Sequence, residues 1–171
     1  MTSLADGASV SKASARVEAC GAVYEANCAI GLALCATDDE LLGTWLGFLQ
    51  QRLFNCSASL ADPSGVALAP TESDVGALEA AIDRLQAASS PTGGFVLPGG
   101  CEAAARLHVA RACMRRAERS AHGLAAGETV APALLSLLNR ASDLLFAAAL
   151  YANAAKATAE TLWDSKALPP E

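Results

Sequence analysis

The sequence predicts an all-α fold: a five-helix antiparallel bundle in one domain of 171 residues. Hydrophobic residues make up 53% of the chain but aromatic residues only 5%, and much of the apolar content is alanine, which has the best helix propensity. Apolar residues recur at three- and four-residue steps in five segments. No segment shows strand alternation and no internal repeat is visible, so short connections between helices favour a bundle.

The first helix is expected over residues 15–35, where five side chains share one face. They are Cys20, Val23, Asn27, Ile30 and Leu34. The second is expected over 38–58, with Thr37 as its N-cap, because acidic residues follow directly in the first turn.

The third helix is expected to end near residue 88 and to open with a capping box from Thr71 to Asp74. The fourth spans residues 101–124. The fifth spans 131–161 and has Pro132 in its first turn.

The stretches outside these helices read as connections. Residues 89–100 are rich in Ser, Pro and Gly and predict a loop. Residues 1–14 form an N-terminal segment and 162–171 a tail.

Composition and cysteine spacing argue against several functions. The net charge is −6 with no basic start or long apolar run, so we expect a cytoplasmic protein without membrane or nucleic-acid partners. None of the six cysteines forms a C-x-x-C pair, so we expect reduced thiols and no metal site. They are Cys20, Cys28, Cys35, Cys56, Cys101 and Cys113.

The fourth helix concentrates positive charge in an acidic protein. The stretch "FVLPGGCEAAARLHVARACMRRAER" holds five arginines, although the whole chain has only 12 Lys and Arg. One helix face is apolar, formed by Leu107, Ala110, Met114, Ala117, Ala121 and Leu124. The adjacent face is polar, formed by His108, Arg111, Arg115, Glu118 and His122.

Two interpretations of this polar face stay open. It could be an ordinary solvated surface, or a site for a small phosphorylated ligand, because guanidinium groups bind phosphate oxygens bidentately. The second is favoured by the glycine-rich entrance to the helix and by a polar cluster in the fifth helix. That cluster is Asn139, Arg140 and Asp143.

Four stretches carry a resemblance to a known family. They are "SLADGASVSK" (3–12), "RVEACGAVYEANCAIGLAL" (16–34), the arginine-rich stretch (95–119) and "LLNRASDLLFAAALYAN" (137–153). In this order they resemble the PduO-type ATP:cob(I)alamin adenosyltransferases.

The resemblance implies a homotrimer of five-helix bundles with sites between subunits. It implies transfer of the 5′-deoxyadenosyl group of ATP to reduced corrinoid cobalt, which forms adenosylcobalamin and releases triphosphate. ATP, Mg²⁺ and cobalamin, the last as substrate, are the expected small molecules.

Residue by residue, the resemblance assigns Arg115 to the triphosphate as a catalytic residue and Asn139 to ATP. It assigns Lys12 to the distal phosphates and Glu118 to organising Mg²⁺ or the arginines. A plain ion pair with a helix neighbour is the alternative for Glu118.

Phe95 is assigned to the corrin face, as a catalytic wall that excludes the lower axial ligand; a loop anchor in the core is its alternative. Arg111 is assigned to the subunit interface, facing position 24 of a neighbour. His108 is expected to be a packing residue and not a cobalt ligand.

Two departures from the family pattern keep other functions open. The family's glycine-rich phosphate loop has no match ahead of Ser3, and Tyr24 stands where the family has an acidic residue. A paralogue that stores or delivers corrinoid with little ATP-dependent activity is one alternative. A trimeric bundle recruited to an unrelated interaction is another. From the residues printed, we expect detectable cobalamin binding, with adenosylation slow or absent.

Overall fold

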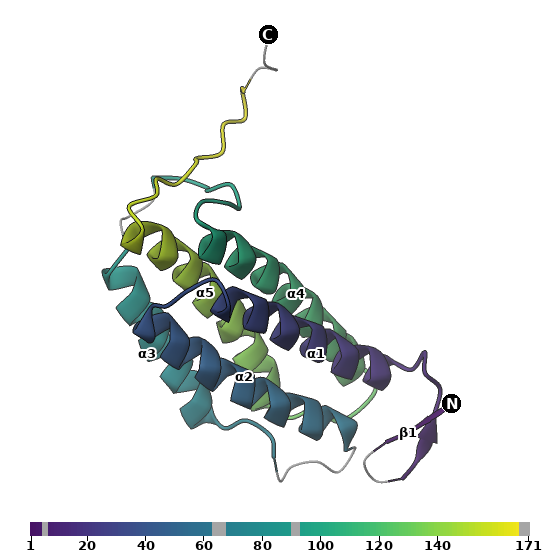
Figure 1. Ribbon diagram of the computed structural model, residues 1–171. Coiled ribbons are helices and arrows are strands. Elements are labelled where there is room, and N and C mark those ends of the chain that lie inside the picture. Colours follow the sequence, from purple (N-terminus) through teal and green to yellow (C-terminus); the bar gives the residue numbers. More distant parts are fainter. Residues whose placement is uncertain (5–6, 63–67, 90–92, 168–171) are drawn as a thin grey trace.

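The computed structural model describes residues 1–4, 7–62, 68–89 and 93–167 of the chain. Five helices dominate it: α1 (Ala15–Leu34), α2 (Glu40–Ala61), α3 (Glu72–Ala87), α4 (Glu102–Ala125) and α5 (Pro132–Ala155). They lie alongside one another as a bundle (Figure 1). The predicted fold class is therefore confirmed.

Hydrogen bonds between helix ends show that α1 is antiparallel to α2 and α4 is antiparallel to α5. Arg16 at the start of α1 binds the carbonyl of Leu60 at the end of α2. The end of α5 meets the start of α4 through Asn153 and Cys101. The principal contacts join α1 to α2, α1 to α4, α4 to α5 and α3 to α5.

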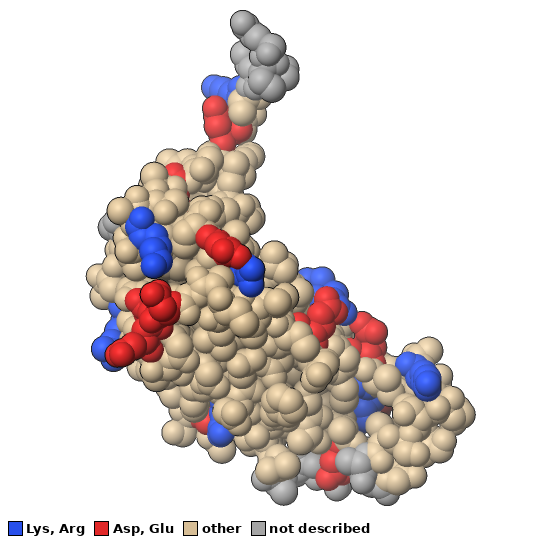
Figure 2. Space-filling view, in the orientation of Figure 1, with Lys and Arg blue, Asp and Glu red and all other residues tan. Residues whose placement is uncertain are grey.

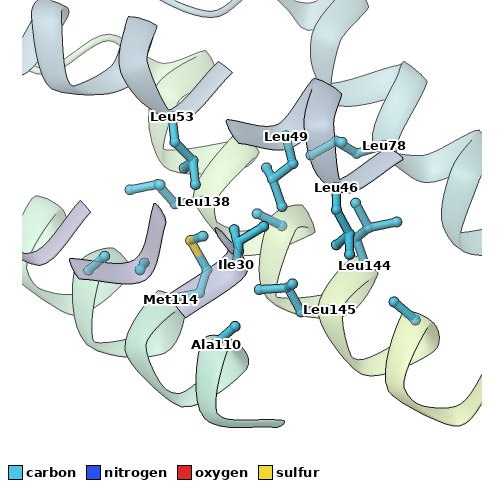
Figure 3. Packing of buried hydrophobic residues seen from close by; sticks show 14 of the residues in the cluster. Ile30, Leu46, Leu49, Leu53, Leu78, Ala110, Met114, Leu138, Leu144 and Leu145 are labelled. Atoms are coloured by element: carbon cyan, nitrogen blue, oxygen red, sulfur yellow. The ribbon is translucent and has the colours of Figure 1, made fainter. Parts of the chain in front are cut away.

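A single apolar core runs between the helices (Figure 3). Its largest fully buried side chains are Ile30, Leu42, Leu46, Leu49, Leu53, Leu60, Leu78, Leu85, Leu107, Met114, Leu124 and Leu134. Buried alanines on α1 and α4 let these two helices approach closely, since small side chains shorten the distance between helix axes.

Side-chain caps fix the starts of α1, α2 and α3. The capping box of α3 is confirmed: the Thr71 backbone N–H donates to Asp74 at 2.8 Å and the Asp74 N–H donates to the Thr71 hydroxyl at 3.3 Å. The predicted N-cap of α2 is wrong. Asp39, not Thr37, caps this helix by accepting from the Leu42 N–H at 2.9 Å.

The predicted end of the fifth helix is also wrong. α5 ends at Ala155, and Ala157 takes a positive φ of 50° that breaks the helical path. The chain then turns back, so Leu162 forms an antiparallel bridge with Val96 in the loop before α4. The sequence predicted a helix to residue 161 because no glycine or proline among residues 156–161 marks its end.

A small hairpin precedes α1 at one end of the bundle (Figure 1). β1 (Thr2–Ser3) pairs antiparallel with β2 (Ser9–Val10), which the sequence did not predict. Residues 5–6 of the expected N-terminal segment, 90–92 of the expected loop and 168–171 of the expected tail lie outside the described residues.

By length and composition alone, α1 and α5 are long and apolar enough to cross a membrane. Both supply core side chains of the bundle, such as Ile30 and Leu145, and core helices pass the same test. The expected absence of a membrane partner stays a prediction.

Candidate functional site

Glu118 is the centre of a polar cluster where α4 packs on α5. Glu118 is 7% exposed, and each of its two carboxylate oxygens has a partner. One oxygen pairs with the Arg115 guanidinium, and the other accepts from the Asn139 side-chain amide at 2.9 Å. A buried carboxylate needs such partners, so Glu118 fixes one residue from each helix.

Arg140 extends this cluster along α5. Its guanidinium donates to the Asn139 side-chain oxygen at 2.6 Å and pairs with Asp143 at 3.3 Å. The sequence placed Asn139, Arg140 and Asp143 in one polar group, and the structure confirms that grouping.

Arg115 is the member of the cluster that can reach a ligand. Its side chain is 46% exposed although one of its terminal nitrogens is held by Glu118. The remaining N–H donors of a guanidinium are in a fixed planar fork, so an anchored and half-exposed arginine is suited to bind an anion bidentately.

The arginines of α4 do not form one continuous patch. Arg106 binds Glu102 and the Leu32 carbonyl, and Arg116 pairs with Glu18 and Glu25 on α1. Each of these two arginines serves a helix contact. Of the remaining three, Arg119 is exposed, Arg111 packs on Phe146 of α5, and Arg115 is held by Glu118.

A second site, an apolar pocket, lies one helical turn from Arg115. It has a volume of about 420 Å³ and is lined by Gly94, Phe95, Val96, Arg111 and Phe146. Arg111 and Arg115 are four positions apart on α4, which corresponds to a rise of about 6 Å. The pocket and the polar cluster therefore adjoin.

Phe95 extends into solvent at the edge of this pocket. It is 80% exposed, so it does not act as a core anchor. Its ring meets the Trp163 ring edge-to-face, with centroids 6.3 Å apart. An apolar ring held at the surface beside a pocket is suited to cover a large apolar ligand.

Arg111 and His108 both pack against Phe146. The Arg111 guanidinium lies 4.5 Å from the Phe146 ring centroid, and its Nε is buried without a hydrogen-bond partner within the chain. The His108 ring lies 6.1 Å from the same ring. His108 is buried and is not among the residues that line the pocket, as expected of a packing residue.

Burial lowers the pKa of His108 below its ordinary value. The nearby Arg111 charge lowers this pKa further, while Glu160 opposes the shift. The imidazole of His108 is therefore neutral at neutral pH.

The structure does not join Lys12 or Tyr24 to the cluster. Lys12 is exposed in the turn before α1, and no hydrogen bond or ion pair links it to Arg115 or Asn139 in the described chain. Tyr24 is 59% exposed on the outer face of α1. Roles for both would require a second subunit or a ligand.

The cysteines and acidic residues give no metal centre in the described ranges. All six cysteines are free thiols, and no group of three or more His, Cys, Asp or Glu side chains is arranged to hold a metal ion. Burial raises the pKa of Cys56 to about 12, so this thiol stays protonated.

Three contributors to the site were not predicted from the sequence. Phe146 lies in a stretch already singled out, seven residues beyond Asn139, and helical spacing could have placed it on the same face. Trp163 and Asn153 gave no local signal, because their partners lie in the loop before α4, distant in sequence.

The fold and these two adjoining sites define a helical-bundle protein suited to hold an anionic ligand beside an apolar one. The family model described as cobalamin adenosyltransferase matches residues 1–152. The chain belongs to the cobalamin adenosyltransferase family.

Similar proteins agree in sequence and in structure. The corrinoid adenosyltransferase PduO of Salmonella typhimurium is 47% identical over 152 residues, covering 86% of this chain and 45% of the relative. The chain therefore spans less than half of that relative's length. A corrinoid adenosyltransferase of Bacillus subtilis is 37% identical over 169 residues, covering 95% of this chain and 86% of the relative.

A solved structure shares the fold closely. It is a variant of a PduO-type ATP:corrinoid adenosyltransferase from Lactobacillus reuteri with a phenylalanine changed to alanine, complexed with cobalamin and ATP. It has a TM-score of 0.90 and 33% identity, and the match covers 95% of this chain and 93% of that one.

Proposed function

We propose that this chain is an ATP:cob(I)alamin adenosyltransferase, which transfers the 5′-deoxyadenosyl group of ATP to reduced corrinoid cobalt. The observation that carries the proposal is the position of Arg115, anchored by buried Glu118 one turn from the apolar pocket at Phe95. This arrangement would bring the phosphates of ATP close to a corrin ring.

The ATP half of the reaction rests on the polar cluster. Arg115 would bind the triphosphate, with Asn139 holding the nucleotide and Glu118 keeping both side chains in place. Lys12 would approach the distal phosphates only when ATP binds. Because triphosphate leaves with growing negative charge, a fixed guanidinium lowers the barrier.

Mg²⁺ would accompany ATP. The described residues offer only isolated carboxylates near Arg115, and Mg²⁺ commonly takes most of its protein-site ligands from one or two carboxylates, substrate phosphates and water. When bound, it would neutralise phosphate charge, and the residues of this chain would serve mainly to orient the nucleotide.

The corrinoid half rests on Phe95 and Phe146. Phe95 would cover the lower face of the corrin and keep water and nitrogen ligands from cobalt, which favours the four-coordinate cob(II) form that is easier to reduce. Once an external reductant has supplied one electron, the cob(I) centre attacks C5′ of ATP. The new Co–C bond forms from the electron pair of cob(I) as the C5′–O bond breaks, and triphosphate leaves with the electron pair of the broken C5′–O bond.

We also propose a homotrimer in the cytoplasm. Arg111 has a buried Nε without a partner within the chain, and Tyr24 is largely exposed on α1. Contact between a neighbour's α1 and this α4 would cover Tyr24 and the part of the Arg111 side chain that is still exposed. Figure 2 shows a broad area without Lys, Arg, Asp or Glu in the middle of the displayed face, which supports burial against another subunit.

Separate titrations with ATP and with a corrinoid, followed by calorimetry and absorbance, test the proposed function. Binding of both ligands supports the enzyme. Binding of corrinoid alone would favour a carrier of the cofactor. Binding of neither would contradict both functions.

A further inference from the structure

The Asn153 side chain joins three separate parts of the chain. It lies in the last turn of α5 and is 1% exposed. Its oxygen accepts from the Cys101 backbone N–H at 2.8 Å. Its amide nitrogen donates to the Gly99 carbonyl at 3.3 Å and to the Glu160 carboxylate at 2.9 Å. One carboxamide thus connects the start of α4, the loop before it and the segment after α5.

The backbone at Gly100 is shaped to receive this carboxamide. Gly100 has a φ of +100°, a conformation that side-chain-bearing residues rarely adopt. A Cβ built on Gly100 would lie 2.1 Å from the Asn153 oxygen and 2.3 Å from its nitrogen. The Asn153 side chain therefore occupies the space that a side chain at position 100 would need.

The segment after α5, residues 158–163, pairs with the loop that carries Phe95. The Leu97 N–H donates to the Thr161 carbonyl at 2.8 Å, and the Trp163 N–H donates to the Phe95 carbonyl at 2.7 Å. Figure 1 shows this C-terminal segment running beside the loop that enters α4. We call residues 158–163 the C-terminal strap.

Phe95 depends on this strap because the core does not hold it. With 80% of its surface exposed, Phe95 is supported by its backbone bond to Trp163 and by the Trp163 ring. Asn153 and Glu160 fix the strap where it leaves α5. The polar cluster that is proposed to bind ATP has no hydrogen bond or ion pair with the strap in the described chain; it lies where Asn139 binds Glu118.

From this geometry we infer that Asn153, acting with Glu160, is a positioning residue for Phe95. It holds the strap against the loop and thereby sets the corrinoid half of the reaction without touching the ATP half. This inference rests on the proposed function, since it assumes that Phe95 covers a corrin.

Hydrogen exchange of the ligand-free protein tests the structural step. In Asn153→Ala, the amides of Leu97 and Trp163 are expected to lose protection about tenfold, which corresponds to about 1.4 kcal/mol, because buried polar groups in the loop and the strap lose their partner. Amides within α2 should stay as in the wild type. Unchanged protection at Leu97 and Trp163 would overturn the inference.

Steady-state kinetics test the functional step. Asn153→Ala is expected to raise the corrinoid KM by about tenfold or more and to leave the ATP KM within about twofold, since misplacing one binding group affects only the ligand it contacts. The fraction of bound cob(II)alamin that is four-coordinate, read from its absorption spectrum, should fall as well. Equal changes in both KM values would show a general structural role.

Asn27→Ala is the matched control. Asn27 is also a buried asparagine, 5% exposed, and donates to the backbone carbonyl of Gln50 at 3.3 Å, away from the Phe95 loop. It should lower thermal stability while leaving the corrinoid KM unchanged. A rise in corrinoid KM equal to that of Asn153→Ala would contradict the inference.

A reversal of the hydrogen bond tests the link between Asn153 and Glu160. Asn153→Asp keeps the acceptor for Cys101 but places two carboxylates together. Adding Glu160→Gln supplies an amide donor between them, so the double variant should regain part of the protection at Trp163 and of the corrinoid affinity. If the double variant had the same protection at Trp163 and the same corrinoid affinity as Asn153→Asp, the proposed link between Asn153 and Glu160 would be contradicted.

The two levels of failure are distinguishable. A wild-type chain that binds neither ATP nor corrinoid removes the proposed function, whereas the exchange experiment still reports on the strap. A wild type that binds both ligands, with normal exchange and normal corrinoid KM in Asn153→Ala, removes only the present inference.

Discussion

At the scale of single residues, Glu118 gives the candidate site its geometry and Arg115 supplies its charge. The carboxylate is buried between two helices and uses both oxygens, so the guanidinium is anchored on one side and free on the other. An arginine without this anchor would lose more conformational entropy when it binds phosphate.

Replacement of Arg115 by alanine should weaken ATP binding far more than corrinoid binding. A charge-assisted contact to phosphate contributes about 1.5–3 kcal/mol, so the ATP dissociation constant should rise at least about tenfold. Calorimetric titration with each ligand measures the difference. Arg116→Ala is the control, because Arg116 pairs with Glu18 and Glu25 on α1. Equal loss of both ligands in Arg115→Ala would indicate unfolding.

His108 should make the stability depend on pH. Burial and Arg111 lower its pKa in the folded protein, against the opposing charge of Glu160. The unfolded chain, whose histidine pKa is about 6.5, then binds a proton more readily, so stability falls as the pH drops below about 6.5. The loss is complete once the pH lies below the folded pKa.

His108→Phe should therefore flatten the decrease in unfolding free energy between pH 7 and pH 5, pH values chosen to bracket about 6.5. Urea denaturation at both pH values provides the measurement. His122→Gln, at an exposed position of the same helix, is the comparison. If the unfolding free energy of His108→Phe decreased between the two pH values as much as that of the wild type, His108 would not be the titrating group.

At the scale of elements, the existence of all five helices could be predicted because each has its own run of apolar residues at helical spacing. The alanine-rich stripe of α4, from Leu107 to Leu124, is buried as predicted. The Thr71–Asp74 box also formed as the local sequence required. These signals are local, so one sequence suffices to find them.

Helix ends that depend on distant residues could not be predicted. α5 stops at Ala155 although the following residues favour a helix, because Asn153 and Glu160 commit the chain to the loop before α4. The sequence predicted Thr37 as the cap of α2, whereas the geometry selects Asp39. The same limit hid Trp163 from the predicted site.

Arg16 should stabilise the contacts of α1 with the end of α2 and with the α4–α5 connection. Its side chain is 4% exposed and binds Glu128 in the α4–α5 connection as well as the Leu60 carbonyl. Arg16→Met should lower the free energy of unfolding by about 1–3 kcal/mol, because the buried carbonyl loses its donor.

Urea denaturation measures this loss. Glu102→Gln removes only an exposed ion pair with Arg106 and should cost about 0–1 kcal/mol. Equal losses in Arg16→Met and Glu102→Gln would contradict a special role for Arg16.

At the scale of the whole molecule, an apolar patch on α1 and α4 supports the proposed trimer. Leu32 and Val109 are each 59% exposed and line one surface pocket with Ala29 and Arg106. Exposed apolar groups that adjoin across two helices are typical of an interface.

Light scattering should give the mass of a trimer at micromolar concentration, and Leu32→Glu should give a monomer. A buried unpaired charge would cost the interface several kcal/mol, whereas the folded monomer keeps this side chain in water. Circular dichroism should show an unchanged helix content in the variant. A wild type that scatters only as a monomer would remove the inter-subunit site.

The central claim is that the polar cluster and the pocket work together on two substrates. A single-turnover reaction of the chain with ATP and chemically reduced cob(I)alamin tests it most directly, since even a slow transfer is detected. We predict that adenosylcobalamin appears with an equal amount of triphosphate, and that Arg115→Ala and Phe95→Ala each reduce the yield. Bound corrinoid with no ATP-dependent Co–C bond, at any length of incubation, would contradict the account.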